Sequence, residues 1–187
     1  MTANGQRRDR GGPHPLERVA GAGLLALLVV HPLLRPEGGW AVLSTCDVAA
    51  FATAIGLLTG WHRWIAAAFV FQLAIGLPAL ILGMLTTYHA NVTGIAVHVV
   101  PLVIGGVLVR RHGMPHRSAL IAWAAQAVTL VLAAALAPPA LNINFATIVW
   151  PPVAGSLSLI QFQVALTAAV GVALMLVELC ARALTER

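Results

Sequence analysis

Six apolar stretches, each close to the length of a membrane-crossing helix, follow one another along this chain of 187 residues. A bilayer is crossed by about 20 mainly apolar residues in an α-helix. Only 9% of the residues are charged, whereas a soluble domain carries about 25%. We therefore expect an all-α polytopic membrane protein with six transmembrane helices. They are predicted at residues 18–34, 40 or 41–60, 65–85, 91–109, 118–136 and about 157–181.

Composition divides the chain into three parts. Residues 1–17 are polar, basic and rich in glycine and proline, which predicts a disordered tail. Residues 18–182 form the predicted six-helix transmembrane domain. Within it, residues 137–156 contain four prolines and no charge. This connector is expected outside the cytoplasm, where it either lies in the membrane interface or dips back as a re-entrant lid.

The arginines predict how the helices are oriented. All eleven basic residues are arginine, and six spans would place ten of them on the same side as both termini, with only Arg35 opposite. By the positive-inside rule, both termini are cytoplasmic and the protein lies in the plasma (inner) membrane of a bacterium. Because these arginines lie at helix ends and in the tail, the net charge of +5 does not predict binding to nucleic acid.

Polar residues converge on the outer third of the predicted membrane. With a rise of ~1.5 Å per residue, Cys46 lies roughly 7–8 Å below the outer boundary and His98 roughly 9–10 Å below it. His31 lies about one turn below the same face, and His89 lies in an outer loop. Ionisable groups inside a span cost several kcal/mol, roughly 2.5–3.5, so this layer is the predicted functional site.

The layer contains the parts of a nucleophilic site. A thiol reacts as the thiolate and needs a base, which His98 would supply to Cys46. Asp47 would orient a histidine, although its side chain points about 100° away from that of Cys46. Each residue also has a simpler role that stays open: a small core side chain for Cys46, a hydrogen bond between helices for His98 and a carboxylate near a helix start for Asp47.

Other outer polar residues complete the predicted site. Thr45 is a candidate hydrogen-bond donor to the developing oxyanion. We expect the remaining groups to contact substrate or the developing oxyanion. They are Asn142, Asn144, His31 and His89.

A metal or haem site is the main alternative from the same residues. His31, His89, His98 and Asp47 offer imidazole and carboxylate ligands. No pair of histidines stands three or four residues apart within one span, so we assign no metal and no cofactor. Near the cytoplasmic end, Glu178 and Arg182 are predicted to form an i,i+4 ion pair.

The short sequence around Cys46 resembles a known family. Residues 43–51, Leu-Ser-Thr-Cys-Asp-Val-Ala-Ala-Phe, and residues 98–101, His-Val-Val-Pro, are similar to the YwaF-like six-helix membrane proteins. That family is grouped with the androgen-induced membrane acyltransferases and hydrolases. The run Asn142-Ile-Asn-Phe145 and the following Pro151-Pro-Val-Ala-Gly155-Ser are similar to the segment before its last helix. The resemblance covers roughly residues 40–180. It implies a nucleophile on an early helix and a histidine on a later one, acting on lipid acyl groups. One branch of the group uses cysteine, which Cys46 and His98 would match, and another uses threonine, which makes Thr45 an alternative nucleophile.

The leading hypothesis is therefore a lipid acyltransferase or fatty-acyl ester hydrolase with a Cys46–His98 pair. Its partners would be membrane lipids, with self-association left open. The alternative is a non-enzymatic membrane module that binds metal or haem or packs within a larger complex. A small-solute transporter is less favoured, because the sequence has no inverted repeat.

Overall fold

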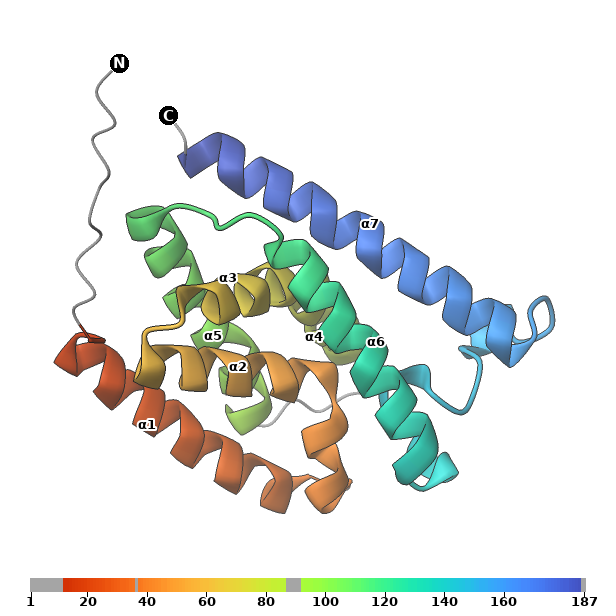
Figure 1. Ribbon diagram of the computed structural model, residues 1–187. Coiled ribbons are helices and arrows are strands. Elements are labelled where there is room, and N and C mark those ends of the chain that lie inside the picture. Colours follow the sequence, from red (N-terminus) through yellow and green to blue (C-terminus); the bar gives the residue numbers. More distant parts are fainter. Residues whose placement is uncertain (1–11, 36, 87–91, 186–187) are drawn as a thin grey trace.

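The computed structural model describes residues 12–35, 37–86 and 92–185, and within these ranges the chain is helical with no strand. Figure 1 shows the helices stacked against one another, with α7 along one side. The helices, in chain order, are α1 (Pro15–Val30), η1 (His31–Leu34), η2 (Gly38–Leu43), α2 (Thr45–Thr59), α3 (His62–Phe71), η3 (Gln72–Gly76), α4 (Leu77–Thr86), α5 (Val92–His112), α6 (Ser118–Leu136), η4 (Pro139–Leu141), η5 (Ile143–Phe145), η6 (Pro151–Val153) and α7 (Leu159–Thr185).

Within the described residues, five helical segments are long and apolar enough to cross a membrane. They are Pro15–Leu34, His62–Leu85, Val92–His112, Ser118–Leu136 and Leu159–Thr185. Each corresponds to a predicted span. The first begins at Pro15, three residues before its predicted start, because His14 and Glu17 form a capping box there. Residues 15–17 of the predicted tail are therefore helical, while residues 1–11 lie outside the described part of the chain.

The second predicted span, by contrast, is not one continuous helix. The residues from Gly38 to Leu43 form a 3₁₀ helix, and α2 has only 15 residues. At the break, Ser44 has an extended backbone (ψ 132°). Asn144 forms hydrogen bonds with the backbone groups on both sides of the break. Its Nδ2 donates to the Leu43 carbonyl oxygen (2.7 Å) and its Oδ1 accepts from the Thr45 amide (3.1 Å). A six-span architecture is thus not established by helix length alone.

The third span bends at a π-turn rather than at a simple proline kink. Pro78 has no N–H, and its ring would clash with the carbonyl four residues earlier in a regular α-helix. The chain widens just before it, where the Leu77 amide donates to the Gln72 carbonyl oxygen, five residues back. π-turns of this kind are frequent at functional positions.

Small residues allow the helices to pack closely. Gly56 and Gly60 form a Gly-x-x-x-Gly pattern that serves packing within the chain, since a Cβ on Gly56 would meet Ile65 of α3, and Gly60 ends α2 with a left-handed backbone (φ 76°). Gly105 likewise lies against Phe69. The largest apolar cluster joins α2, α3, α6 and α7, and a second one joins α1, α2 and α5.

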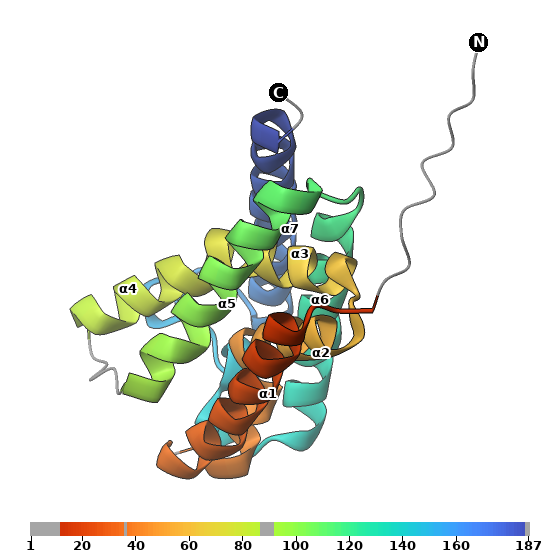
Figure 2. The ribbon, with the colours of Figure 1, turned by 90° about the vertical axis from the view of Figure 1, so that its left-hand side faces the viewer.

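The chain connections divide between two ends of the bundle. The start of α1, the α2–α3 connection, the α5–α6 connection and the end of α7 lie together on the left of Figure 1, as the second view also shows (Figure 2). The connector 137–156 lies at the other end and folds back onto α6 and η2, where Ile143 and Ala146 are buried. Of the seven described arginines, only Arg35 belongs to that second end.

Candidate functional site

His31 forms the centre of a buried polar row built from three helices. It begins η1 and is completely buried. Its Nδ1 lies 2.9 Å from Thr93 Oγ1, in the first turn of α5. Its Nε2 lies 3.6 Å from Asp47 Oδ1, in the first turn of α2. Thr93, His31 and Asp47 are called the Thr–His–Asp row below.

The neighbours of His31 favour one form of its ring. A carboxylate facing Nε2 favours the neutral tautomer that carries its proton there. Nδ1 then has a free lone pair and accepts the hydrogen bond of the Thr93 hydroxyl. The 3.6 Å separation from Asp47 is longer than a hydrogen bond, but catalytic hydrogen bonds often tighten only when substrate binds. The row thus has a hydroxyl, a base and a carboxylate in the order that nucleophilic catalysis uses.

Burial differs along the row. Thr93 is partly exposed, whereas Asp47 is 2% exposed. Both oxygens of Asp47 are buried with no hydrogen-bond partner, as is His31 Nε2. Leaving such groups unpaired in an apolar interior is costly, which marks Asp47 as a residue with a role beyond packing.

Gln72 joins this region to the backbone of two other helices. From the π-turn, its Nε2 donates to the carbonyl oxygens of Cys46 in α2 (3.1 Å) and Val97 in α5 (3.3 Å). Its Oε1 is buried without a hydrogen-bond partner. This side chain therefore ties three helices together at the depth of the row.

His98 lies beside the π-turn. Its Nδ1 donates to the Gly94 carbonyl oxygen (2.8 Å), which leaves Nε2 as the acceptor of a neutral ring. A Cβ on Gly76 would collide with Gln72 Oε1 and touch the His98 ring at 3.5 Å. The absence of a side chain at Gly76 is what makes room for both polar groups.

The structure does not bring Cys46 and His98 into the predicted pair. No hydrogen bond joins the Cys46 thiol to a histidine within the described residues, and Cys46 packs against the apolar cluster of α2, α3, α6 and α7. Asp47, one residue later, turns instead toward His31. This is the divergence of about 100° that adjacent helix positions impose.

The other predicted residues have structural partners. Thr129 donates to the Gln126 carbonyl oxygen, so Thr45 donates to Thr129 (2.8 Å) and has no histidine as a base. Asn142 closes a turn by donating to the Ile148 carbonyl oxygen and accepting from the amides of Thr147 and Ile148. Asn144 repairs the start of α2. His89 lies outside the described residues.

The metal alternative finds no support in the described part of the chain. Within it, no group of three or more His, Cys, Asp or Glu side chains is arranged to hold a metal ion. His31, His98 and Asp47 are near one another but do not form a ligand set.

The predicted Glu178–Arg182 ion pair is wrong. Glu178 instead accepts hydrogen bonds from the backbone amides of Arg117 (3.0 Å) and Ala119 (2.6 Å), at the start of α6. Unpaired amides at a helix start are a favourable site for an anion, and the Glu178 carboxylate occupies this one.

Next to the row, Arg35 pairs with Glu37. The Arg35 Nε and Nη2 atoms donate to the two Glu37 oxygens at 2.9 and 3.0 Å. This hydrogen bonding lowers the pKa of Glu37 below its ordinary value. The Arg35–Glu37 pair places one positive and one negative charge at the end of the bundle that holds the row.

Sequence reasoning missed Thr93 and Gln72 as parts of this region. Thr93 lies at the entry to the fourth predicted span, in the same outer layer as His31, and that shared depth is the signal that could have identified it. Gln72 lies in the predicted span 65–85, and no sequence pattern shows which carbonyl groups it reaches.

Comparison with known proteins does not assign this chain to a family. No protein-family model, curated protein or solved structure matches the chain.

Proposed function

We propose that this chain is an integral membrane enzyme that hydrolyses or transfers fatty-acyl groups of membrane lipids. The reaction class is the one expected from the sequence, but the residues differ. Thr93 is the nucleophile, His31 the base and Asp47 the group that orients the base. The observation that carries the proposal is the contact of the two His31 ring nitrogens with a hydroxyl and a carboxylate from two other helices.

The proposed reaction proceeds through an acyl-enzyme. Thr93 Oγ1 attacks the carbonyl carbon of a lipid ester while its proton passes to His31 Nδ1. Asp47 stabilises the imidazolium that forms. The tetrahedral intermediate collapses, the C–O bond of the ester breaks, and His31 returns the proton to the leaving alcohol. Water or an acceptor alcohol then attacks the Thr93 ester with His31 again as base.

The position of Thr93 suits an ester substrate. It is the second residue of α5, so it lies within a few ångströms of the helix start, given the ~1.5 Å rise per residue. Lipid ester carbonyls lie at the boundary between headgroups and hydrocarbon, where such a helix begins. The positive end of the α5 dipole is also placed to stabilise the developing oxyanion.

The charge distribution supports an orientation for this site. The end with most of the described arginines would face the cytoplasm and the row would face outward. The proposed location is the inner membrane with both termini cytoplasmic.

Covalent labelling tests the nucleophile. The detergent-solubilised protein is treated with an alkyl fluorophosphonate, and the modified residue is found by peptide mass spectrometry. We expect the label on Thr93, its loss in Thr93→Val, which preserves side-chain shape, and its retention in Thr93→Ser. Thr59→Val is the matched control, because Thr59 donates only to the Ile55 carbonyl oxygen of its own helix.

The same experiment discriminates the competing assignments. A label on Cys46 that Cys46→Ala and His98→Ala abolish would replace the Thr–His–Asp row with the Cys–His pair implied by the family resemblance. If the folded wild-type protein takes up no label and cleaves none of a panel of fluorogenic acyl esters, the enzyme proposal is refuted. The non-enzymatic module then becomes the better explanation of the buried polar groups.

A further inference from the structure

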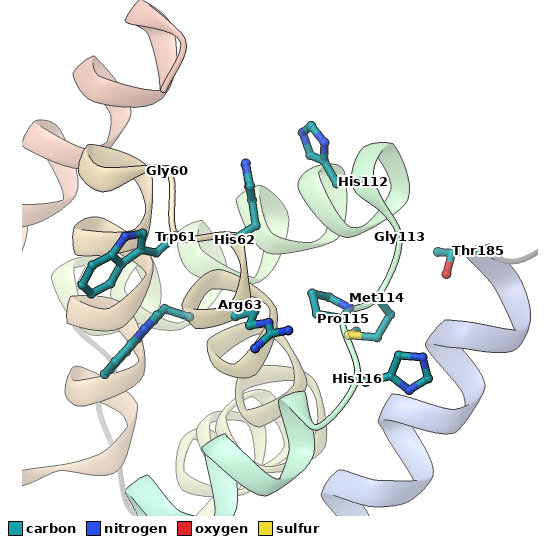
Figure 3. Close-up of a pocket in the computed structure, with 11 residues that line it drawn as sticks. Gly60, Trp61, His62, Arg63, His112, Gly113, Met114, Pro115, His116 and Thr185 are labelled. Atoms are coloured by element: carbon teal, nitrogen blue, oxygen red, sulfur yellow. The ribbon is translucent and has the colours of Figure 1, made fainter. Parts of the chain in front are cut away.

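A second polar site lies at the opposite end of the bundle from the row. It is a pocket of about 620 Å³ between the α2–α3 connection, the α5–α6 connection and the end of α7 (Figure 3). This volume falls within the range of small-molecule sites, roughly 300–1,000 Å³. Arg63, His62, His112 and His116 line it, and none of the lining residues within the described part of the chain is acidic.

Two of its histidines are stacked. The rings of His62 and His112 have centroids 4.5 Å apart and planes inclined by 30°. His62 Nδ1 is buried and has no hydrogen-bond partner. Imidazole groups this close disfavour simultaneous positive charge, unless an anion between them offsets the repulsion.

The third histidine, His116, carries its ring proton on Nδ1 and can donate a hydrogen bond from that atom. Arg182 Nη2 lies 3.3 Å from His116 Nε2, and a guanidinium group only donates hydrogen bonds. Nε2 of a neutral His116 is therefore the acceptor, so its proton is on Nδ1. Thr185, at the end of α7, adds a hydroxyl to the same pocket, as Figure 3 shows.

Tryptophans form one side of the pocket. Trp61 and Trp64 are exposed, with ring centroids 6.3 Å apart. Indole rings with one polar edge are typical of the headgroup layer of a membrane. The pocket thus combines arginine and imidazole donors with side chains suited to the depth at which phosphate groups of lipids lie.

We propose that this pocket binds a phosphate-bearing anion, with Arg63 and the stacked His62 and His112 as its main contacts. The shared chemistry is a phosphate group held by arginine and imidazole donors. Its source is either the headgroup of an anionic lipid or a soluble phosphate compound. This proposal does not depend on the Thr–His–Asp row.

Lipid and phosphate binding are measured separately. Titration of phosphatidylglycerol into protein in phosphatidylcholine nanodiscs, followed by native mass spectrometry, reports the lipid source. Thermal unfolding in detergent with inorganic phosphate, against chloride at equal ionic strength, reports the soluble source. The variants are Arg63→Gln, His112→Gln and, as control, Arg18→Gln, which removes the same charge at the same end of the bundle but outside the pocket.

Hydrogen bonds to charged groups contribute enough that losing one weakens binding tenfold or more, whereas a distant surface arginine contributes about fivefold. We expect Arg63→Gln and His112→Gln to weaken at least one of the two ligands tenfold, and Arg18→Gln to have the smaller effect. The ligand affected identifies the source. Equal effects of all three variants, or wild-type binding in both pocket variants with folding intact, would overturn the proposal.

Discussion

A single proton position decides whether His31 can act as a base. Nδ1 accepts from Thr93 only while the ring proton is on Nε2, and Asp47 is the group that favours this form. An amide in place of the carboxylate can donate to Nε2 and so favours the opposite tautomer. The ring would then present an N–H to the Thr93 hydroxyl, and the hydroxyl would lose its base.

Asp47→Asn is therefore expected to slow fluorophosphonate labelling of Thr93 by about 10²–10⁴, the usual range for general-base catalysis. The stability of the protein should be preserved or increased, because the substitution removes a buried carboxylate without changing its shape. Labelling rate and thermal unfolding measured on the same preparation check both parts. A labelling rate equal to wild type would show that Asp47 does not orient His31.

The sequence indicates which polar residues lie close together, but not which of them form pairs. Polar residues at matched depth were predicted to converge, and His31, Asp47 and His98 do lie in one region. Which of them meet depends on helix rotation, and a change of one residue turns a side chain by about 100°. Cys46 and Asp47 are adjacent in sequence yet face different clusters for this reason, so depth alone could not select the partner of either.

Among the helices, the π-turn of the third span has a distinct role. Gln72, the first residue of this turn, donates to backbone carbonyl groups of both α2 and α5. Two backbone carbonyls that already belong to helices receive an additional donor. Hydrogen bonds between membrane helices contribute about 0.6–2 kcal/mol.

We expect Gln72→Leu to lower the free energy of unfolding by about 1–2 kcal/mol, because both interhelical bonds are lost from a buried site. Leu73→Met, one residue along the same π-turn and partly exposed, is the control and should change stability by less than about 0.5 kcal/mol. Thermal unfolding in one detergent measures both. Equal stability of Gln72→Leu and wild type would mean that the contacts have no net effect.

The start of α6 is held by a carboxylate from another helix. Glu178 serves as a cap from 59 residues away, which no local sequence pattern predicts. Glu17, by contrast, caps its own helix, accepting from the His14 amide at an exposed site.

Glu178→Ala should destabilise the protein by about 2–3 kcal/mol, because one buried and one partly buried amide lose a charged acceptor. Glu17→Ala removes an exposed local cap and should cost about 1 kcal/mol or less. Comparing the two unfolding temperatures tests whether burial or the mere presence of a cap matters. A larger loss in Glu17→Ala would contradict the assignment.

The spans were easier to predict than the breaks within them. Apolar length located the helices to within a few residues, and 118–136 matches α6. The interruption at Ser44 was hidden because the acceptor and donor that replace its helical bonds come from Asn144, about one hundred residues later. Long-range side-chain contacts of this kind leave no trace in hydropathy.

At the scale of the whole molecule, the proposed orientation can be read from chemical accessibility. Single cysteines at Ile148, in the connector, and at Thr185, at the end of α7, are placed in a Cys46→Ala, Cys180→Ala background. A membrane-impermeant maleimide should label the Ile148 position in intact cells and the Thr185 position only in inverted vesicles. The reverse pattern would place the row on the cytoplasmic side.

The unequal helix lengths have a consequence for the surrounding lipid. At ~1.5 Å per residue, the 15 residues of α2 extend about 22 Å and the 27 residues of α7 about 40 Å, while a hydrocarbon core measures about 30 Å. Ile55 of α2 lies on the surface of the bundle, with 43% of its area exposed, so on our proposal lipid contacts this helix. A bilayer adapts to a short helix by thinning beside it. Asp47 lies in the first turn of α2. Thinning of the bilayer at that end would bring the ester carbonyls of the lipids closer to the Thr–His–Asp row, which on our proposal cleaves them.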